Sequence, residues 1–310
     1  MKLSFEKIKE LAVGVIDVTQ DEDGIINFHR FTPDQLDAFG MQSEGVRKNA
    51  TSTTGNRLDF ETDSKNLTFT VAGDGKYEVL VNTLPIYCNG LKKGESASIE
   101  LEEGTKRITL LMPSHSVGAL YSVELDDGAT ANRHKFDCRA LFIGDSITQG
   151  WNSAFDSMSW AYRTSFHLNA HSLILGVGGA SYHTPSFPIV PGYNPDYVFI
   201  KLGTNDYHHY KTMQESLYHQ IGFLRKATYH YKDAKIYVIT PIYRLDLDKV
   251  PPMGDWWEYV EKLAEQAKSF DVTLIDGNKL MPHFEKFFAD ALHPNDLGFA
   301  SIALNLIKQL

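Results

Sequence analysis

From residue 140 onward, short apolar runs alternate with longer stretches of helical periodicity. The apolar runs have the length and composition of buried strands, at residues 140–143, 172–177, 197–202, 235–240 and 272–275. Helical patterns follow near residues 157–168, 213–231, 255–270 and 295–310. This alternation predicts a parallel sheet covered by helices on both faces. Ligands of such sheets bind outside the carboxyl ends of the strands, so functional residues are expected there.

Residues 1–135 have a different, all-β pattern. Polar and apolar residues mostly alternate over residues 67–71, 77–81, 98–101, 107–111 and 121–125. Turn signals separate these runs at Gly73-Asp-Gly75, Asn89-Gly90, Glu103-Gly104 and Asp126-Asp-Gly128. They predict a β-sandwich of jelly-roll type, with residues 25–31 as a further strand and residues 32–39 as a short helical turn or loop. Residues 126–135 lack a buried periodicity and are expected to connect two domains, residues 1–135 and residues 136–310.

The composition excludes several classes of protein. A net charge of -9 makes nucleic acid and anionic membranes unsuitable partners, since both need a basic surface. The two cysteines, Cys88 and Cys138, are too few for a disulfide scaffold or a cysteine zinc site, and we expect both to be buried, reduced and inert. The N-terminal residues mix charged with apolar side chains, without the unbroken apolar core of a signal peptide, so a cytoplasmic location is expected.

The first strand of the second half ends at Gly144-Asp145-Ser146. Ser146 should therefore lie on a strand-to-helix turn, where the free N–H groups and the positive dipole end of the helix stabilise negative charge beside its hydroxyl. The sequence thus makes Ser146 a candidate nucleophile. The alternative is that Asp145-Ser146 serves only to cap the helix.

Three further segments follow strands of the same predicted sheet. A glycine turn at Gly178-Gly179 exposes backbone N–H groups, and Asn205 offers a side-chain amide after the third strand. Asp290 precedes His293 by three residues, a spacing at which a carboxylate can bond Nδ1–H and leave Nε2 to take a serine proton. Together these supply a nucleophile, a base, its orienting group and oxyanion donors, the parts needed for ester cleavage.

Each segment also has an ordinary structural explanation. Gly178 and Gly179 are compatible with close packing alone, and Asn205 with a turn or a cap. Asp290 and His293 are compatible with a structural hydrogen bond at a helix entrance. Four such coincidences at successive strand ends are much less expected than one.

The same residues resemble a known family. Gly144-Asp-Ser-Ile-Thr148, Gly179, Gly203-Thr-Asn-Asp206 and Asp290-Ala-Leu-His-Pro294 are similar, in this order, to the four blocks of the SGNH or GDSL-type hydrolases. The resemblance covers residues 138–310 and implies a flavodoxin-like hydrolase domain with a parallel sheet and flanking helices. Residues 55–130 resemble, more loosely, the β-sandwich that precedes this domain in one branch of esterases and acylhydrolases.

The resemblance implies a role for each matching residue. Ser146 would be the nucleophile, His293 the base and Asp290 its orienting carboxylate. The oxyanion donors would be the N–H groups of Ser146 and Gly179 and the side-chain amide of Asn205. One departure is that the family usually has an asparagine shortly before the oxyanion glycine, where this chain has Ile174-Leu175. We expect this departure to change the support of the glycine rather than the chemistry.

Five side chains near the strand ends are candidates for contact with the substrate: Trp151, Tyr182, His183, Tyr207 and Arg244. Trp151 fits a pocket wall or the core equally well. Arg244 suits recognition of an anionic group, although a surface salt bridge is the alternative. No metal site is expected from the adjacent histidines after Tyr207, because neighbouring side chains seldom converge on one ion. The proline-containing segment 245–255 is expected to form a loop at the rim or a lid.

These observations predict a serine esterase that needs neither a metal nor an organic cofactor. The expected substrate is a small ester with a short acyl group, acetyl first, and an acetylated sugar is one candidate carrier. Two alternatives stay open: an acyltransferase that uses the same acyl-enzyme, and a non-catalytic carbohydrate-binding protein. Whether the chain forms a homo-oligomer is left open by the sequence.

Overall fold

A computed structural model of the chain describes residues 1–247 and 253–310. The residues group into two compact units that are not continuous in sequence. The first unit contains residues 1–32, 51–137 and 155–157, and the second contains residues 33–50, 138–154 and 158–310. The chain thus leaves the first unit after Asp137, close to the predicted domain boundary at residue 135, but residues 33–50 belong to the second unit.

The second unit is built on a five-stranded parallel sheet with the order β13-β12-β14-β15-β16. Its strands are β12 (Cys138–Gly144), β13 (Ala170–Gly176), β14 (Tyr197–Lys201), β15 (Lys235–Ile239) and β16 (Thr273–Ile275). Numbered along the chain, this order is 2-1-3-4-5, that of a flavodoxin-like sheet, whose switch point lies at the end of its first strand. The predicted parallel sheet is confirmed, and all five strands fall where the apolar runs indicated.

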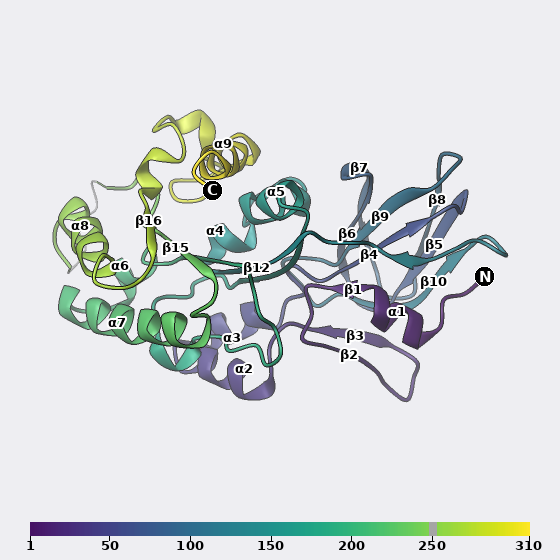
Figure 1. Cartoon of the computed structure of the whole chain (residues 1–310), viewed down its shortest axis with the longest axis horizontal. Coiled ribbons are helices and arrows are strands. Elements are labelled where there is room, and N and C mark those ends of the chain that lie inside the picture. Colours follow the sequence, from purple (N-terminus) through teal and green to yellow (C-terminus); the bar gives the residue numbers. More distant parts are fainter. Residues whose placement is uncertain (248–252) are drawn as a thin grey trace. The chain divides into compact units, whose positions relative to one another are not determined.

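Helices cover both faces of this sheet. They are α4 (Ser146–Gln149), α5 (Trp160–His167), α6 (Asp206–His209), α7 (Met213–His230), α8 (Trp256–Ala267) and α9 (Asp296–Ile307). Helix α5 packs on α9 on one side, and α7 packs on α8 on the other (Figure 1). Single turns of 3₁₀ helix are η1 (Asp156–Met158), η2 (Thr184–Ser186), η3 (Gly277–Lys279) and η4 (Glu285–Phe287). Polar side chains at Thr212, Asp255 and Asn295 accept hydrogen bonds from free N–H groups of the first turn, which explains where α7, α8 and α9 begin.

Two further helices of the second unit come from the N-terminal part of the chain. They are α2 (Pro33–Gly40) and α3 (Glu44–Ala50), and α2 contacts η2 of the second unit. Residues 32–39, predicted as a helical turn or loop, are therefore mostly helix. No local signal in the sequence indicates that this helical pair joins the second unit, because the contacts that hold it there are made 129 and 144 residues further along the chain.

The first unit consists of two antiparallel sheets, with the orders β1-β4-β9-β6-β7 and β2-β3-β10-β5-β8. The strands are β1 (Ala12–Val13), β2 (Asp17–Gln20), β3 (Ile26–His29), β4 (Arg57–Thr62), β5 (Asn66–Val71), β6 (Gly75–Val81), β7 (Leu84–Leu91), β8 (Ser96–Glu100), β9 (Lys106–Leu111), β10 (Ala119–Leu125) and β11 (Asn132–Arg133), the last pairing with β4. The pairs β3·β10, β4·β9, β5·β8 and β6·β7 are nested within one another, which is the winding of a jelly roll. The predicted all-β region is confirmed.

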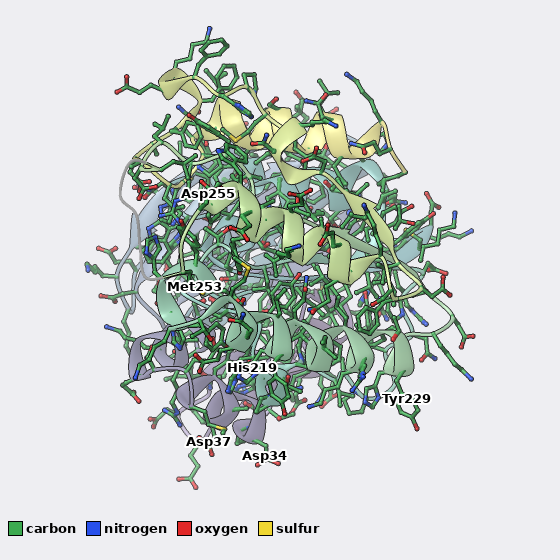
Figure 2. All side chains as sticks on the ribbon, turned by 90° about the vertical axis from the view of Figure 1, so that its left-hand side faces the viewer. Asp34, Asp37, His219, Tyr229, Met253 and Asp255 are labelled. Carbon is green, nitrogen blue, oxygen red and sulfur yellow. The ribbon has the colours of Figure 1, made fainter. Side chains whose placement is uncertain are left out.

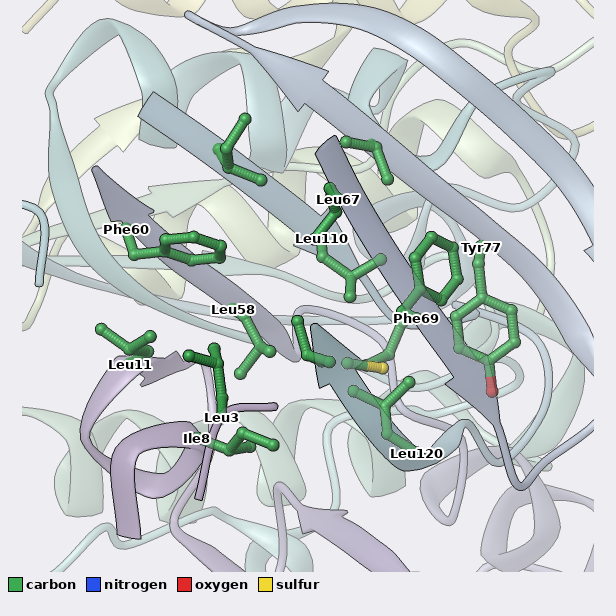
Figure 3. Close-up of a cluster of buried hydrophobic side chains, with 14 of the residues drawn as sticks. Leu3, Ile8, Leu11, Leu58, Phe60, Leu67, Phe69, Tyr77, Leu110 and Leu120 are labelled. Atoms are coloured by element: carbon green, nitrogen blue, oxygen red, sulfur yellow. The ribbon is translucent and has the colours of Figure 1, made fainter. Parts of the chain in front are cut away.

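Apolar side chains from both sheets fill the interior of this unit (Figure 3). Phe60 and Leu110 come from one sheet and Leu67 and Phe69 from the other, and all four side chains are fully buried. Helix α1 (Phe5–Leu11) adds Ile8 and Leu11 to the same cluster. The alternating pattern in the sequence thus has a structural cause: apolar residues of each strand point into the core and polar residues point outward.

Two details of the first unit differ from expectation. Asn89-Gly90, expected as a turn, lies inside β7, and the chain reverses instead at Asn82 and Thr83, both with a positive φ. Cys88 and Cys138 are free, as expected, but half-buried rather than buried. Burial nevertheless raises the pKa of Cys88 to about 11, which keeps this thiol protonated at neutral pH. Within the described residues, no helix is long and apolar enough to cross a membrane.

Candidate active site

Ser146 begins α4 directly after β12, at the carboxyl edge of the sheet. The strand ends at Gly144, where a Cβ atom would lie 2.0 Å from Oγ1 of Thr148, so only glycine permits so sharp a turn. Asp145 is the N-cap of α4, and its Oδ1 accepts a hydrogen bond from the N–H of Ile147 at 3.0 Å. The capping role considered for Asp145 therefore leaves the Ser146 hydroxyl free to contact His293.

A buried lysine supports this turn from the neighbouring strand. Lys201, the last residue of β14, donates from Nζ to Oδ2 of Asp145 at 2.9 Å and to Oγ1 of Thr204 at 2.8 Å. Burial lowers the pKa of Lys201, and the carboxylate of Asp145 opposes that shift. The sequence signal for this interaction is a single charged residue, Lys201, at the end of an otherwise apolar strand. The sequence does not indicate which residue it pairs with.

Ser146, His293 and Asp290 form a continuous hydrogen-bonded chain. Oγ of Ser146 lies 2.9 Å from Nε2 of His293, and Nδ1 of His293 lies 2.8 Å from Oδ2 of Asp290. Ser146 is almost completely buried and the side chain of His293 is 15% exposed, so their contact is shielded from bulk water. Residues 147 positions apart in the chain thus meet with the geometry that the sequence predicted.

Asp290 is held in place by more than its histidine. Its Oδ1 accepts hydrogen bonds from the backbone N–H groups of Leu292 and His293, at 2.8 and 2.7 Å, and its Oδ2 accepts one from Nδ2 of Asn152 at 2.9 Å. Partial burial alone would raise the pKa of Asp290, but the hydrogen bonds from His293 and Leu292 outweigh it and hold this pKa below its usual value. The carboxylate that contacts Nδ1 of His293 is therefore charged at neutral pH.

The loop after β13, residues 177–181, carries the candidate oxyanion donor Gly179 and is here called the oxyanion loop. Four of its N–H groups already have acceptors: Val177 bonds the carbonyl of Gly144, Gly178 bonds Oε1 of Gln149, Ala180 bonds the carbonyl of Val177, and Ser181 bonds Oε1 of Gln42. The N–H of Gly179 has no acceptor among the described residues, and the same holds for the N–H of Ser146. Of the two candidate glycines, Gly179 is thus the one whose N–H is available for a ligand.

Asn205 lies against the same loop. It follows β14, and its Nδ2 donates a hydrogen bond to the carbonyl of Ala180 at 3.0 Å. An amide nitrogen carries two hydrogens, so one remains for another acceptor. The ends of β12, β13 and β14 therefore bring Ser146, Gly179 and Asn205 to one edge of the sheet, as the predicted topology required.

The sequence did not predict the supporting contacts of several residues: Gln42, Asn49, Gln149, Asn152 and Lys201. Asn49 of α3 donates from Nδ2 to the carbonyl of Gly178 at 2.9 Å. The asparagine expected just before the oxyanion glycine is absent, and side chains from α2–α3 and from α4 hold the loop instead. Amides are common on protein surfaces, so nothing in the local sequence distinguished these from solvated ones.

Of the five candidate substrate contacts, the structure places Trp151 beside His293. Its indole is half-buried, and its ring centre lies 6.3 Å from that of His293. Tyr182, by contrast, is 1% exposed and its ring packs edge-on against Phe223, so it belongs to the core. The sequence does not distinguish the two cases, because a tyrosine ring next to a glycine-rich turn can point either outward or inward. Burial of its apolar ring favours the inward position.

The other three candidates also have internal partners. Tyr207 is buried against Trp256 and Tyr259 and donates its hydroxyl to the carbonyl of Gly254 at 2.5 Å. Arg244 is only 3% exposed, and its Nε and Nη2 bond both carboxylate oxygens of Asp246, at 2.6 and 2.9 Å. The ion pair considered for Arg244 thus exists, but it is buried rather than on the surface.

His183 is half-buried and its ring lies 5.3 Å from that of His219 on α7. Burial, reinforced by the charges of His219 and His209, lowers the pKa of His183 to about 4. Figure 2 shows His219 on the face of the second unit that also carries Asp34 and Asp37 of α2.

Across residues 1–247 and 253–310, no three His, Cys, Asp or Glu side chains are grouped as a metal site would require.

A cavity of about 460 Å³ reaches Asp290 and is lined by Leu245, Glu285, Phe288 and the segment Ala289–Ala291. The backbone N–H of Leu245 donates to the carbonyl of Ala291 at 2.8 Å, which ties the start of the expected rim loop to the segment that carries Asp290. Residues 248–252 of that loop, with Pro251-Pro252, lie outside the described residues.

Solved structures share this fold over nearly the whole chain. A salicylyl-acyltransferase, SsfX3, from a tetracycline biosynthetic pathway aligns with a TM-score of 0.80 at 20% identity, covering 96% of this chain and 92% of its own. A putative GDSL-like lipase from Bacteroides ovatus aligns with a TM-score of 0.73 at 16% identity, covering 100% and 96%. The acetyl xylan esterase Est2A from Butyrivibrio proteoclasticus aligns with a TM-score of 0.69 at 16% identity, covering 100% and 97%.

No curated relative matches the sequence. Residues 142–300, just over half of the chain, match the GDSL-like Lipase/Acylhydrolase family. This match includes Ser146, Gly179, Asn205, Asp290 and His293, the residues that the structure brings together at the edge of the parallel sheet. The resemblance and the ester-hydrolase class that the sequence predicted are confirmed, and the chain belongs to the GDSL-like lipase/acylhydrolase family.

Proposed function

We propose that the protein is a serine esterase that hydrolyses short-chain acyl esters through an acyl-enzyme on Ser146. The observation that carries this proposal is the unbroken hydrogen-bond chain from Ser146 through His293 to Asp290. In this scheme Nε2 of His293 takes the proton of the serine hydroxyl as Oγ forms a bond to the ester carbonyl carbon. Asp290 holds the imidazole in the required tautomer and stabilises the imidazolium that forms.

The oxyanion of the tetrahedral intermediate would accept hydrogen bonds from three donors. These are the N–H groups of Ser146 and Gly179 and the remaining hydrogen on Nδ2 of Asn205, all without an acceptor of their own among the described residues. Collapse of the intermediate breaks the bond to the alcohol, which leaves with the proton from His293. Water, deprotonated by the same histidine, then attacks the acyl-enzyme and releases the acid.

Two observations support a short acyl group and a polar alcohol. The ring of Trp151 stands beside His293, with 6.3 Å between the ring centres, and would limit the size of an acyl group bound there. Among proteins of the same fold, Est2A is an acetyl xylan esterase, and a family two carbohydrate esterase from Clostridium thermocellum has been solved in complex with cellohexaose. Acetylated carbohydrates are therefore the first substrates to try.

An acyltransferase is the second candidate function. The solved structure with a TM-score of 0.80 to this chain is a salicylyl-acyltransferase. The covalent intermediate would be the same, and only the acceptor that attacks it would differ. A non-catalytic sugar-binding role is less compatible with the hydrogen-bonded serine, histidine and aspartate.

The proposal is tested by hydrolysis of p-nitrophenyl esters from acetate to long acyl chains. The wild type, Ser146→Ala and a control, Ser269→Ala, are compared; Ser269 is exposed just beyond α8, where its hydroxyl bonds the carbonyl of Gln266. We expect acetate to be the best substrate and kcat/KM to fall at least about 1,000-fold in Ser146→Ala, with the control unchanged. Equal activity in Ser146→Ala and the wild type would remove Ser146 from the mechanism.

The same reaction separates hydrolysis from transfer. Repeating it with xylose or another polyol as an added acceptor, and identifying the products by mass spectrometry, distinguishes free acetate from an acetylated acceptor. Free acetate alone supports the esterase. An acetylated acceptor whose yield depends on Ser146 supports the acyltransferase.

A further inference from the structure

Residues 33–50, here called the helical insert, reach the oxyanion loop of the second unit. The insert carries α2 and α3, and it lies outside the matched residues 142–300. Three of its side chains meet the loop around Gly179. Oε1 of Gln42 accepts from the N–H of Ser181 at 2.9 Å, Nδ2 of Asn49 donates to the carbonyl of Gly178 at 2.9 Å, and Cγ2 of Val46 lies 3.2 Å from where a Cβ on Gly179 would be.

The contact of Asn49 acts on the peptide unit that contains the oxyanion donor. The carbonyl of Gly178 and the N–H of Gly179 belong to the same planar trans peptide, in which C=O and N–H point in opposite directions. An amide that holds the carbonyl on one side therefore aims the N–H toward the other side. The structure shows this N–H without an acceptor among the described residues.

This peptide unit needs such a constraint because it joins two glycines. Glycine has no Cβ and populates both signs of φ, so a peptide between two glycines can rotate at small cost. Gly179 has φ +82, in the left-handed region. The preceding peptide is fixed separately, because the N–H of Gly178 donates to Oε1 of Gln149 at 2.7 Å. Asn49 is thus the side chain that fixes the plane carrying the Gly179 donor.

We infer that Asn49 is a positioning residue for ester hydrolysis, which acts by holding the Gly178–Gly179 peptide with its N–H directed at the oxyanion. The inference rests on the proposed function, since it requires Gly179 to be an oxyanion donor. It assigns a positioning role to one residue of the helical insert, Asn49, although the insert precedes Ser146 by about a hundred residues and lies next to strands of the other unit in sequence.

The test uses full-length Asn49→Asp and Asn49→Ala. Asn49→Asp keeps the shape of the side chain but replaces the donor by an oxygen that repels the Gly178 carbonyl, while Asn49→Ala only removes the donor. The control is Gln35→Glu, because Nε2 of Gln35, on the same insert, also donates to a backbone carbonyl, that of Ile189 at 2.7 Å, away from the oxyanion loop. Each variant is checked for folding by circular dichroism and thermal unfolding.

For p-nitrophenyl acetate we expect kcat to fall about 10- to 100-fold in both Asn49 variants, with KM within about threefold of the wild type. The affinity for a trifluoromethyl ketone, which forms a tetrahedral adduct on the serine, should fall by the same factor as kcat/KM. This parallel loss is the readout that a purely structural role would not produce. Gln35→Glu should retain kcat within about twofold.

Three outcomes would overturn the inference. The first is a folded Asn49→Asp or Asn49→Ala with an unchanged kcat, and Asn49→Ala decides the matter if Asn49→Asp does not fold. The second is an equal loss in Gln35→Glu, which would indicate a general effect of the insert. The third is a wild type without Ser146-dependent turnover, which would overturn the proposed function as well, whereas the first two outcomes leave that function standing.

Discussion

Lys201 of β14 donates a hydrogen bond to Asp145, the residue that caps the helix beginning at Ser146, and both side chains are shielded from solvent. The same ammonium bonds Thr204, one residue before Asn205. A single buried cation therefore links the turn that carries the proposed nucleophile to the strand end that carries a proposed oxyanion donor. Removal of one partner from a buried ion pair leaves the other charge uncompensated, which is costly.

The first prediction concerns this ion pair. Lys201→Met keeps much of the side-chain volume but leaves Asp145 buried without its cation, so the free energy of unfolding should fall by about 3–5 kcal/mol. The control, Lys235→Met, replaces an exposed lysine at the start of the neighbouring β15 and should change it by no more than about 0.5 kcal/mol. Urea unfolding followed by fluorescence measures both. A loss below about 1 kcal/mol in Lys201→Met would mean that the pair contributes little to stability.

The second prediction separates backbone strain from catalysis at Gly179. Gly179 and Gly192 both have a positive φ, +82 and +73, so alanine should destabilise the fold at either position by about 1–2 kcal/mol. Only at Gly179 should kcat also fall, by at least about tenfold, because the strained peptide moves its N–H away from the oxyanion. Kinetics with p-nitrophenyl acetate and thermal unfolding of both variants test this. Equal kcat values in the two variants would argue against Gly179 as a donor.

The third prediction concerns pH and Asp206, which is fully buried and has one carboxylate oxygen, Oδ2, without a hydrogen-bond partner among the described residues. Burial raises the pKa of Asp206 from 3.8 to about 7. Between these two values the folded chain binds a proton that the unfolded chain has released, so the free energy of unfolding falls as the pH rises from about 4 to about 7. Asp206→Asn should remove this contribution. Its free energy of unfolding, compared with that of the wild type, should therefore be more favourable at pH 7 than at pH 4.

Urea titrations of the wild type and Asp206→Asn at several pH values between 4 and 8 measure this difference. Burial also raises the pKa of Glu78 and Asp156 in the first unit, and both contribute with the same sign. The lowered pKa of His183 contributes with the opposite sign, so the test is the difference between the two proteins: Asp206→Asn should gain stability relative to the wild type as the pH rises from about 4 to about 7. Parallel stability curves for the two proteins would show that Asp206 has no raised pKa.

The residues of the proposed triad were predictable because the chemistry needs specific side chains at strand ends. The order of five strands and helices predicted which loops share one edge of the sheet, and Ser146, Asn205 and His293 lie there. The candidate substrate contacts were harder to place. Tyr182 and Tyr207 lie shortly after strands, at the same edge of the sheet as Trp151. Their rings nevertheless pack into the core, whereas that of Trp151 does not.

The sequence alone determined the all-β first part and the parallel sheet of the second, and it made Ser146, Asp290 and His293 the candidate catalytic residues, because strand and helix periodicity and the spacing of reactive side chains are local properties. Only the tertiary structure decided that α2 and α3 belong to the second unit. It also decided that Gln149 accepts the hydrogen bond from the N–H of Gly178, which leaves the N–H of Gly179 available. In the same way, it made Asn49 a partner of the oxyanion loop and Lys201 a partner of Asp145, at the turn before Ser146. These are pairings between residues far apart in the chain, and a hydrogen-bond partner is selected by the folded geometry rather than by its neighbours in sequence.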